Sequence, residues 1–482
     1  MNRERLKHRN QRCIIERIIV KGYLVLQTPA CLGSGDTDSD VDLAILRDSI
    51  EDKALLMGSS IAGALRNYLC EFSNGYNATE TSLLFGAQRS DDDGEQSPLI
   101  IDDALSSAQI QVELRDLVRI NSITRTAEEG AKFNFEVLEA GTKFEISFEL
   151  LINSNSNREQ LLRELLIVLQ GLEKGEIPIG MKKRRGFGRC CVKQWQVWKF
   201  NLQDHKQRKE WLNFPHWTTG LLTEYPDNIY NSIQEALDVL PVTDDKRTRL
   251  TIEAIFTLAS PLLIRSGQAS VDKAPDVVHL KSRRQGELIS VLSGTSLAGV
   301  LRHRAERIIK TLHKDKSIID KIFGTDFTTN KTEQVIASRL TVDEVEINDT
   351  TDLIQNRIAI DRFTGGALHG ALFDEQPIFG NDNTKLVIKL ELRQPDNHEV
   401  GLLLLLLKDL WTGDLPVGGT SSIGRGRLQG IVANITHCEA EKSENTWTIS
   451  QSSKNEPVNV TNASVLEKYV DALNTFDKEI AA

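Results

Sequence analysis

The chain of 482 residues contains the same long pattern twice, and this duplication limits what it can fold into. Residues 18–35 align without a gap on 250–267, with Pro29 matched to Pro261 and a Ser-Gly pair at the C-terminal end of each segment. A period of roughly 230 residues is far longer than the ~20–50 residues of a solenoid repeat, so it indicates two duplicated domains. Each copy is long enough to bury a hydrophobic core of its own.

Four further matches follow in the same order in both copies. They pair GSSIAGALR (58–66) with GTSLAGVLR (294–302), 120–124 with 360–364, 130–133 with 370–373, and 186–188 with 424–426. The agreement at ordered places supports duplication rather than chance.

Composition places the chain among soluble globular proteins, with 40% hydrophobic and 26% charged residues. No apolar run approaches the ~20 residues of a membrane span, so we expect no membrane partner. The charged N-terminus leads into no apolar signal-peptide core. The six cysteines show no metal-ligand spacing, which predicts reduced thiols and a cytoplasmic location.

The net charge of −10 argues against a free-standing nucleic-acid binder, which usually carries a basic field. The charge is uneven, however. Segments 182–185 and 302–310 are basic, whereas 36–42 and 90–95 are acidic. This pattern favours a subunit of a larger assembly that presents only its basic strip to a phosphate backbone.

Both copies predict the same order of elements. An alternating apolar strand is followed by Gly-Ser/Thr-Ser opening a helix, a long polar excursion, more strand, a second helix, a glycine-rich loop and a last strand. The helices are expected at 58–70 and 158–175 in the first copy and at 294–313 and 398–413 in the second. The β-α-β…β-α-β order predicts an α+β fold of two tandem ferredoxin-like domains.

The predicted domain boundaries follow from this pattern. They are 1–200 for the first domain, 201–247 for a connector, 248–440 for the second domain and 441–482 for a C-terminal extension.

Two kinds of segment are candidate phosphate sites. The helix starts offer an N-terminal anion site, with Ser59 or Ser60 and Thr295 or Ser296 as expected N-caps. The glycine-rich loops bring backbone N–H groups close to phosphates, because glycine has no Cβ to hold the backbone away. Such contacts position a strand without reading its sequence. The candidate RNA-binding residues are Gly58, Ser59, Ser60, Arg66, Lys182, Lys183, Arg184, Arg185, Gly186 and Gly188 in the first copy, and Thr295, Ser296, Arg302, Gly424, Arg425, Gly426 and Arg427 in the second.

These motifs together resemble the backbone subunit of type III CRISPR effector complexes, in the RAMP superfamily. The most specific of them is IDRFTGGALHGALF (360–373), and together they span roughly 18–190 and 250–430. The chain is similar to a tandem fusion, as in type III-D variants. The resemblance implies RNA-recognition-like domains with inserted β-hairpin thumbs, and guide CRISPR RNA, complementary target RNA and other RAMP subunits as partners.

The resemblance also implies an activity. Many members cut the paired target RNA with a divalent metal and one aspartate, which precedes an apolar stretch that ends in a base. Asp42, followed by Arg47, and Asp276, followed by Lys281, fit that pattern. Both are therefore candidate catalytic residues and candidate ligands of Mg²⁺ or another divalent cation, of the kind that stabilises in-line displacement at phosphorus. Two sites imply two cuts about six nucleotides apart.

The resemblance places thumbs near 88–131 and 330–371. Ile123 and Thr124 in the first copy, and Phe363 and Thr364 in the second, are the candidates to contact a displaced nucleotide. The first copy has two glycines fewer at this place than the second, so its thumb is expected to differ in detail.

Three alternatives remain open at this point. The first alternative is a non-catalytic RNA-binding scaffold, the second is a guide-processing endonuclease of the same superfamily, and the third is a nucleotidyltransferase. The endonuclease often relies on histidine, and neither His279 nor His369 is duplicated. The nucleotidyltransferase would use Gly33-Ser34 with Asp40 and Asp42. Its gap between serine and aspartate is usually longer, and it leaves the duplication unexplained.

Overall fold

The computed structural model describes residues 13–35, 41–76, 83–86, 96–121, 123–266, 275–284, 286–325, 335–440 and 444–476. The chain forms two compact units. Unit 1 comprises Met1–Val112, Glu136–Met181 and Phe187–Arg247, and unit 2 comprises Glu113–Phe135, Lys182–Gly186 and Thr248–Ala482. The segment 201–247, predicted as a separate connector, thus belongs to unit 1, and the predicted C-terminal extension belongs to unit 2. Glu113–Phe135 and Lys182–Gly186, which lie in the first copy of the sequence pattern, belong to unit 2.

Unit 1 is built on an antiparallel sheet with the strand order β3-β7-β1-β8-β9. The strands are β1 (Ile14–Leu26), β3 (Leu99–Ile101), β7 (Lys143–Asn153), β8 (Cys190–Asn201) and β9 (Ile229–Tyr230). Helix α2 (Gly58–Asn74) lies between β1 and β3 in the chain, and α3 (Arg158–Glu173) lies between β7 and β8. This connectivity with this strand order is ferredoxin-like, as predicted.

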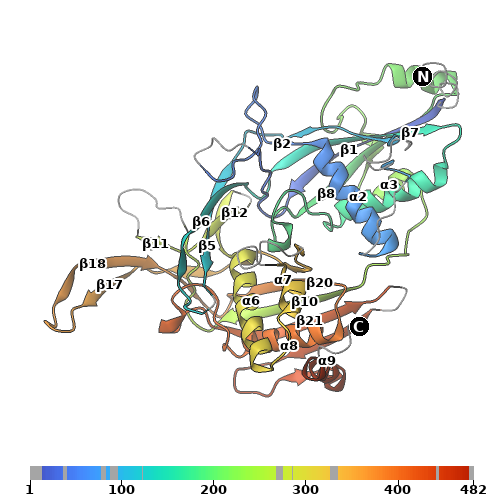
Figure 1. Cartoon of the computed structure of the whole chain (residues 1–482). Helices are drawn as coiled ribbons and strands as arrows, with labels where there is room; N and C mark the ends of the chain where they lie inside the picture. Colours follow the sequence, from blue (N-terminus) through green and yellow to red (C-terminus); the bar gives the residue numbers. More distant parts are fainter. Residues whose placement is uncertain are drawn as a thin grey trace. The chain divides into compact units, whose positions relative to one another are not determined.

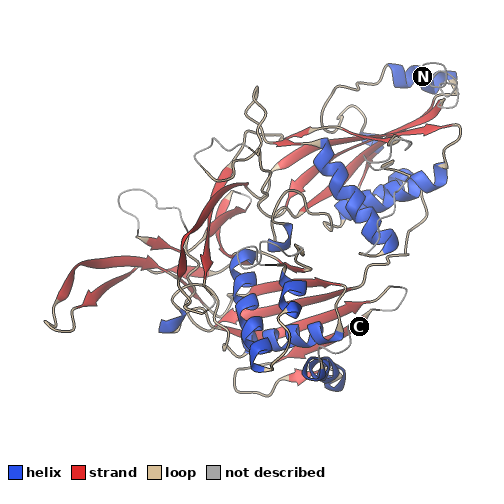
Figure 2. Cartoon of the chain, viewed as in Figure 1, coloured by secondary structure: helices blue, strands red, loops and turns tan. Residues whose placement is uncertain are grey.

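The core of unit 1 lies between this sheet and its two helices (Figures 1 and 2). Strand β7 alternates buried and half-buried residues along KFEISFELLIN, as a sheet covered on one face requires. Helix α3 begins after Asn157, whose side chain accepts a hydrogen bond from Gln160 N–H, and it buries nearly every apolar residue that it carries. Helix α4 (His205–Leu212), the 3₁₀ turn η3 (Pro226–Asn228) and α5 (Ile233–Leu237) complete the unit.

Unit 2 repeats the same fold. Its sheet has the order β14-β20-β10-β21-β22-β23. The strands are β10 (Arg249–Leu258), β14 (Leu340–Val342), β20 (Leu386–Arg393), β21 (Leu428–Cys438), β22 (Asn445–Ser450) and β23 (Asn459–Val460). Helices α6 (Gly294–Thr311) and α8 (Asn397–Trp411) cover one face of it, and α7 (Ser317–Phe323) follows α6 (Figure 1).

The C-terminal residues are part of unit 2 rather than an appendage. Strands β22 and β23 extend the sheet beyond β21. Helix α9 (Ala463–Thr475) packs on α8, and a Cβ built on Gly401 of α8 would lie 2.2 Å from Tyr469 O. The backbones of α8 and α9 therefore meet closely at Gly401.

Two β-hairpins overlap the C-terminal parts of the segments 88–131 and 330–371 predicted as thumbs. The first pairs β5 (Val112–Ile120) with β6 (Ala127–Leu138), and the second pairs β17 (Gln355–Ile360) with β18 (Ala367–Gln376). The second hairpin projects away from the sheet of its unit (Figure 1). Within the described residues, short strands complete both units. They are β11 (Val277–Val278), β12 (Lys281–Arg284), β13 (Glu287–Leu292), β15 (Val345–Ile347), β16 (Thr350–Asp352) and β19 (Ile378–Gly380), and β2 (Leu55–Leu56) and β4 (Ala104–Leu105).

The predicted helix N-caps are wrong by two or three positions. Helices α2 and α6 begin at Gly58 and Gly294, so Met57 and Ser293 are the N-cap residues. Ser293 accepts a hydrogen bond from Ser296 N–H, whereas Met57 offers no side-chain cap. Glycine at the first helical position is explained by packing, because a Cβ on either residue would lie 2.4 Å from a carbonyl oxygen.

The glycine-rich loops have the same structure in both units. Gly188 N–H donates to Pro29 O at 2.8 Å, and Gly426 N–H donates to Pro261 O at 2.8 Å. Each loop contains a short 3₁₀ turn, η2 (Lys183–Arg185) or η4 (Ser421–Ile423). Both turns are preceded by a residue in the left-handed region and followed by a left-handed glycine.

Glycine is required at positions 188 and 426 for two reasons. Both residues have a positive φ, of 74° and 77°. A Cβ on Gly188 would lie 1.8 Å from Ile179 O, and one on Gly426 would lie 1.9 Å from Val417 O. The loop can therefore close onto the end of the first strand only when residues 188 and 426 carry no side chain.

Among the described residues, no helix is long and apolar enough to cross a membrane.

We expect Gly426→Ala to destabilise unit 2 by about 3 kcal/mol or more, because the new methyl group both strains the backbone and collides with Val417 O. Gly299→Ala is the matched control. It lies in α6, where a Cβ would meet no atom of the described residues within 4 Å, so it should be neutral or stabilising by up to about 1 kcal/mol. Urea unfolding followed by circular dichroism measures both variants. Equal midpoints for the two would contradict the steric argument.

Candidate nucleic-acid interface

The two candidate aspartates lie at matching places, beside the second strand of a thumb hairpin. Asp42 is exposed and directly precedes Leu43, whose carbonyl accepts a hydrogen bond from Glu136 N–H at 3.0 Å. Asp276 is exposed, and its Oδ2 accepts a hydrogen bond from Asp374 N–H at 3.0 Å. Strand β11, which follows Asp276, pairs in parallel with β18. Both aspartates are therefore fixed next to the root of a thumb.

Asp374 is a functional candidate that the sequence analysis missed. Its Oδ1 is buried and accepts no hydrogen bond from the part of the chain that the structure describes, while its N–H binds Asp276. A buried carboxylate oxygen without a donor, on a residue whose backbone N–H binds a second aspartate, is suited to a hard divalent cation, which prefers oxygen ligands. The matched position in the first copy holds Asn134. Only the folded structure brings Asp374 next to Asp276, so no sequence spacing reveals it.

The bases of the first glycine loop are engaged within unit 2. Lys182 Nζ lies over the rings of Phe133 and Phe135, 5.1 and 4.8 Å from their centroids. Arg184 Nη1 donates to Thr341 Oγ1 at 3.3 Å. Burial, with the nearby charge of Arg302, lowers the pKa of Arg185. Lys183 is half-buried.

The second glycine loop corrects one prediction. Arg425 is not available to a phosphate backbone, because its side chain is only 4% exposed and pairs with Glu375 at 2.8 Å. It also donates to Gln355 Oε1 at 2.6 Å. The matched residue of the first copy is the buried Phe187, so this position belongs to the core in both units. Arg427, two residues later, is exposed.

The helix-start residues differ in exposure between the two copies. Ser59 and Ser60 are exposed, whereas Thr295 and Ser296 are half-buried. Arg66 donates to Gly86 O at 3.2 Å, and Arg302 donates to Gly324 O at 2.8 Å. These two matched arginines therefore hold the helix to the loop that follows it.

The two thumb tips share one turn. Asn121 Oδ1 accepts hydrogen bonds from the N–H groups of Ile123 and Thr124, and Asp361 Oδ1 accepts them from Phe363 and Thr364. These backbone donors lower the pKa of Asp361.

The loss of two glycines in the first thumb does not change the backbone of its turn. Arg125 takes the left-handed conformation, with φ of 58°, where the second tip has Gly365. Ile123 is 90% exposed and Phe363 is fully exposed, so each tip presents one apolar side chain to solvent.

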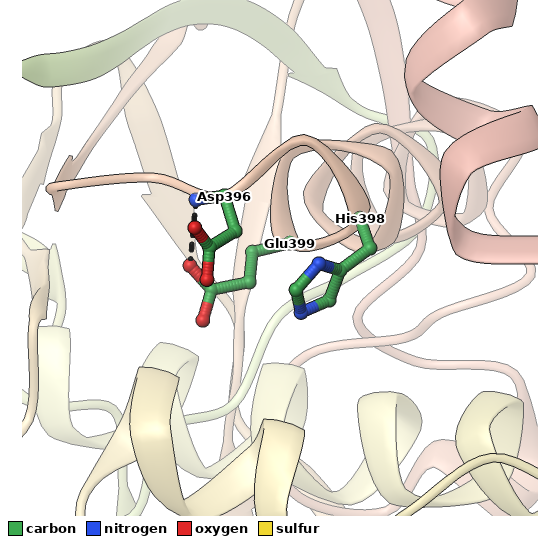
Figure 3. Close-up of side chains that lie close together, drawn as sticks. All are labelled: Asp396, His398 and Glu399. Carbon is green, nitrogen blue, oxygen red and sulfur yellow. Dashed lines mark hydrogen bonds between the residues drawn. The ribbon is translucent and has the colours of Figure 1, made fainter. Parts of the chain in front are cut away.

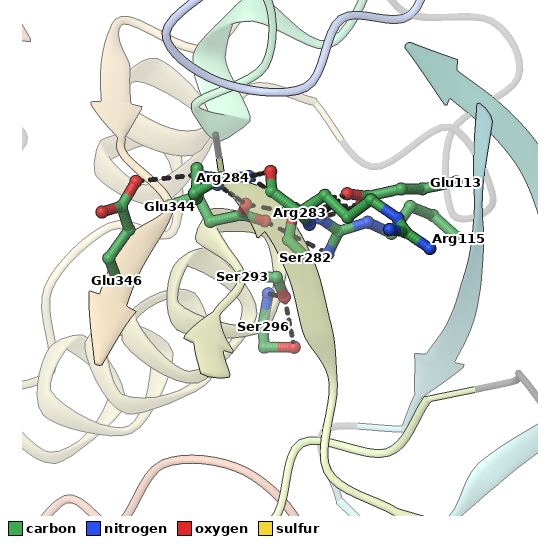
Figure 4. A network of polar contacts seen from close by, with 9 residues as sticks. All are labelled: Glu113, Arg115, Ser282, Arg283, Arg284, Ser293, Ser296, Glu344 and Glu346. Atoms are coloured by element: carbon green, nitrogen blue, oxygen red, sulfur yellow. Dashed lines mark hydrogen bonds and ion pairs between the residues drawn. The ribbon is translucent and has the colours of Figure 1, made fainter. Parts of the chain in front are cut away.

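A buried network of charges holds the first hairpin in unit 2 (Figure 4). Glu113 of β5 accepts hydrogen bonds from Ser282 Oγ at 2.8 Å and Arg283 N–H at 2.7 Å. Arg115 of β5 pairs with Glu113 at 3.0 Å and with Glu344 at 3.2 Å. The side chains of both pairs are at most 7% exposed, so water screens them little.

The network continues on the other side of Glu344. Arg284 of β12 pairs with Glu344 at 2.6 Å and with Glu346 at 2.7 Å. Arg115 and Arg284 thus share the buried carboxylate of Glu344. Arg115 also pairs with Glu113, and Arg284 also pairs with Glu346. The first hairpin is positioned by this arrangement.

The histidines near the sites are structural or solvent-exposed. His279 is 3% exposed, and its Nδ1 accepts a hydrogen bond from Ile264 N–H at 3.1 Å. Burial lowers the pKa of His279 to about 4, so it is neutral near pH 7. His369 is exposed on β18.

One group of three within the described ranges has the spacing of metal ligands: Asp396, His398 and Glu399 (Figure 3). Glu399 Oε2 accepts a hydrogen bond from Asp396 N–H in the capping box that starts α8. Its other oxygen is paired with Arg339, and His398 stacks on Phe476. Helix capping and the adjacent cation account for the cluster, and we assign no metal to it.

Some predicted features lie outside the described residues. They are Asp36, Asp38 and Asp40 of the acidic loop, Gly267, and parts of both predicted thumb segments.

The model of the RAMP superfamily matches residues 23–191 and 255–429, which together are more than half of the chain. The chain belongs to the RAMP superfamily. The two matched regions follow the two copies of the sequence pattern, so the protein carries tandem RAMP domains. A search of the curated proteins finds no relative that matches this RAMP protein.

We expect Arg115→Met to destabilise unit 2 by about 3–5 kcal/mol, because it leaves Glu113 and Glu344 buried with fewer partners. Arg163→Met is the control, since Arg163 pairs with Asp244 on the surface of unit 1, where an ion pair contributes about 0–1 kcal/mol. Urea unfolding and hydrogen exchange of 112–138 provide the measurement. Unchanged exchange in the hairpin would show that the network does not hold it.

Unit 2 should lose stability on acidification through His279. Its folded pKa of about 4 lies below the usual ~6.5 of the unfolded chain, so its contribution is complete above pH ~6.5 and is lost as the pH falls toward 4. The loss between pH 7 and pH 5 should be about 2 kcal/mol. His279→Gln should flatten this slope in urea unfolding, whereas His369→Gln, on the exposed thumb, should leave it unchanged. Equal slopes for both variants would rule out this role of His279.

Proposed function

We propose that the chain is a guide-RNA-binding backbone subunit of a type III CRISPR effector complex, and that it cleaves guide-complementary target RNA at two sites about six nucleotides apart. The observation that carries the proposal is the repeated placement of Asp42 and Asp276 beside the root of a thumb hairpin. Membership of the RAMP superfamily over both copies supports it. The proposal places the protein in the cytoplasm, assembled with guide RNA, target RNA and other RAMP subunits.

The exposed residues support a role in holding RNA. Each thumb tip presents an apolar side chain, Ile123 or Phe363, and carries an exposed arginine, Arg125 or Arg362, within two residues of it in the chain. An aromatic or apolar side chain at a hairpin tip is suited to stack on an unstacked base, and the arginine is suited to a phosphate. Arg427 of the second glycine loop adds a further exposed base.

The acidic residues support a cleavage chemistry. The exposed carboxylate of Asp42 or Asp276 is suited to orient the ribose 2′-hydroxyl or to accept its proton during attack on the neighbouring phosphate. In the second copy, Asp276 and Asp374 would together hold a divalent cation such as Mg²⁺. That cation would supply Lewis-acid stabilisation of the phosphoryl oxygens.

The alternative function is a non-catalytic scaffold, and one observation favours it for the first copy. Asn134 stands where the second copy has Asp374, so the first copy offers one carboxylate fewer for a cation. The two sites are therefore expected to differ in metal affinity, with the second the stronger.

The test is cleavage of end-labelled, guide-matched RNA by the reconstituted complex with Mg²⁺. Asp276→Asn and Asp374→Asn should each slow the same single cut by about 100-fold or more, and Asp42→Asn should slow the other cut. Asp382→Asn, an exposed acid in the turn between β19 and β20, is the matched control and should change neither. All variants should bind guide RNA with a normal, steep salt dependence.

An unchanged product ladder in all three aspartate variants would show that these residues do not cut the target, and the scaffold function would remain. Failure of the wild type to bind guide RNA at low salt would contradict both functions.

A further inference from the structure

At the base of the second thumb, three strands meet in one register. Glu375 of β18 pairs with Val277 of β11 on one side and with Gln355 of β17 on the other. The residues that directly precede Val277 and Glu375 are the two candidate ligands of the cation. The register therefore brings Asp374 N–H to Asp276 Oδ2 at 3.0 Å. A shift of one residue between β11 and β18 would break this hydrogen bond.

The backbone pairing of β11 with β18 fixes this register weakly. Strand β11 has two residues, Val277 and Val278, and both are half-buried. Most residues of β18 are exposed. Short strands with few buried side chains specify their register poorly, because a slip costs little hydrophobic burial. A contact made by side chains is therefore needed to hold β18 in place.

A buried pair of charges supplies that contact. Arg425 Nη1 donates to Glu375 Oε2 at 2.8 Å, and Arg425 Nη2 donates to Gln355 Oε1 at 2.6 Å. The side chains of Arg425 and Glu375 are only 4% and 2% exposed. Arg357 of β17 also pairs with Glu375, at 3.0 Å. One guanidinium from the glycine-rich loop thus binds both members of a cross-strand pair in the hairpin, as the rigid fork of arginine allows.

The first copy has an apolar pair at the same two positions. Phe187 stands where the second copy has Arg425, and Phe135 stands where it has Glu375. Both phenylalanines are buried. Packed apolar residues are often as stable as a buried ion pair, so stability alone does not account for the charges. The charged pair occurs in the copy that also carries the additional aspartate, Asp374.

We propose that Arg425 and Glu375 are positioning residues of the second site. Their ion pair fixes the register of β18 on β11 and thereby holds Asp374 at Asp276, where the two aspartates take up a divalent cation. The proposal rests on the proposed function and adds to it two residues that act through Asp374. A buried polar contact that fixes register is the best-attested use of such a pair.

Hydrogen exchange of the full chain tests the register without RNA or metal. In Arg425→Met, the amides of 370–378 should exchange at least about tenfold faster than in the wild type, because β18 loses its fixed place. Arg339→Met is the matched control. Arg339 pairs with the buried Glu399 elsewhere in unit 2, so its loss should lower stability without raising exchange in 370–378 relative to the rest of the unit.

Binding of Mn²⁺ to the same preparations, followed by electron paramagnetic resonance, tests the effect on the cation. The relevant site is the one that Asp374→Asn removes. Arg425→Met should weaken its affinity by about tenfold or more, the usual size of the effect for residues that hold a metal ligand in place. Arg339→Met should leave the affinity unchanged.

A double variant separates positioning from stability. Arg425→Met combined with Glu375→Leu removes both charges and leaves an apolar pair, so urea unfolding should show most of the stability regained. The Mn²⁺ affinity should stay low, because the fork that joined Glu375 to Gln355 is gone. Recovery of the affinity together with the stability would show that the pair is structural only.

Two further results would overturn the proposal. One is exchange in 370–378 that is no faster in Arg425→Met than in Arg339→Met. The other is a wild type that binds no more Mn²⁺ than Asp374→Asn.

Cleavage by the reconstituted complex keeps this result separate from the proposed function. At limiting Mg²⁺, Arg425→Met should slow only the cut that Asp276→Asn slows, and saturating Mg²⁺ should restore it. A wild type that binds Mn²⁺ as expected but cuts no target would overturn the cleavage function and leave the positioning role standing. Two normal cuts in Arg425→Met at limiting Mg²⁺ would overturn the positioning role alone.

Discussion

Each RAMP domain depends on one backbone contact that has no room for a side chain. The N–H groups of Gly188 and Gly426 donate to the carbonyls of Pro29 and Pro261. A Cβ on Gly188 would lie 1.8 Å from Ile179 O, and one on Gly426 would lie 1.9 Å from Val417 O. The contact ties the loop after the second helix to the end of the first strand. The segment that bears Asp42 or Asp276 follows the same strand in the chain. A methyl group at either glycine would prevent the loop from closing onto that strand end.

The two copies differ mainly in how their thumbs and turns are held. The first hairpin is fixed by buried charges, with Glu113 and Arg115 bound to β12 and to Glu344. Counting back from the matched Ile120 and Ile360, the second copy has Leu353 and Gln355 at those positions. Leu353 is half-exposed and Gln355 binds Arg425. The second hairpin therefore lacks the charge pair of the first at these positions, and its root is held instead by the buried pair of Glu375 with Arg425.

Much of the fold could be predicted because its signals are local. Alternating apolar residues indicated the strands, apolar runs indicated α3 and α8 within two residues at each end, and the glycines marked the tight turns. The N-caps of α2 and α6 were misplaced because Gly58 and Gly294 are chosen by packing against distant carbonyls rather than by capping chemistry. The candidate aspartates came from the family resemblance. Asp374 did not, because it joins Asp276 only through the pairing of β11 with β18.

By itself, the sequence determined the duplication, the order of elements, the ferredoxin-like class and the RAMP family, since each is written in residue order and periodicity. The tertiary structure alone decided which charges are available. Arg425 looked like a phosphate ligand but pairs with Glu375, fifty positions away, and Arg115 pairs with Glu344 across more than two hundred. A charged side chain must find its partner when it is buried, and that partner is set by which strands and turns pack together, not by neighbours in the chain.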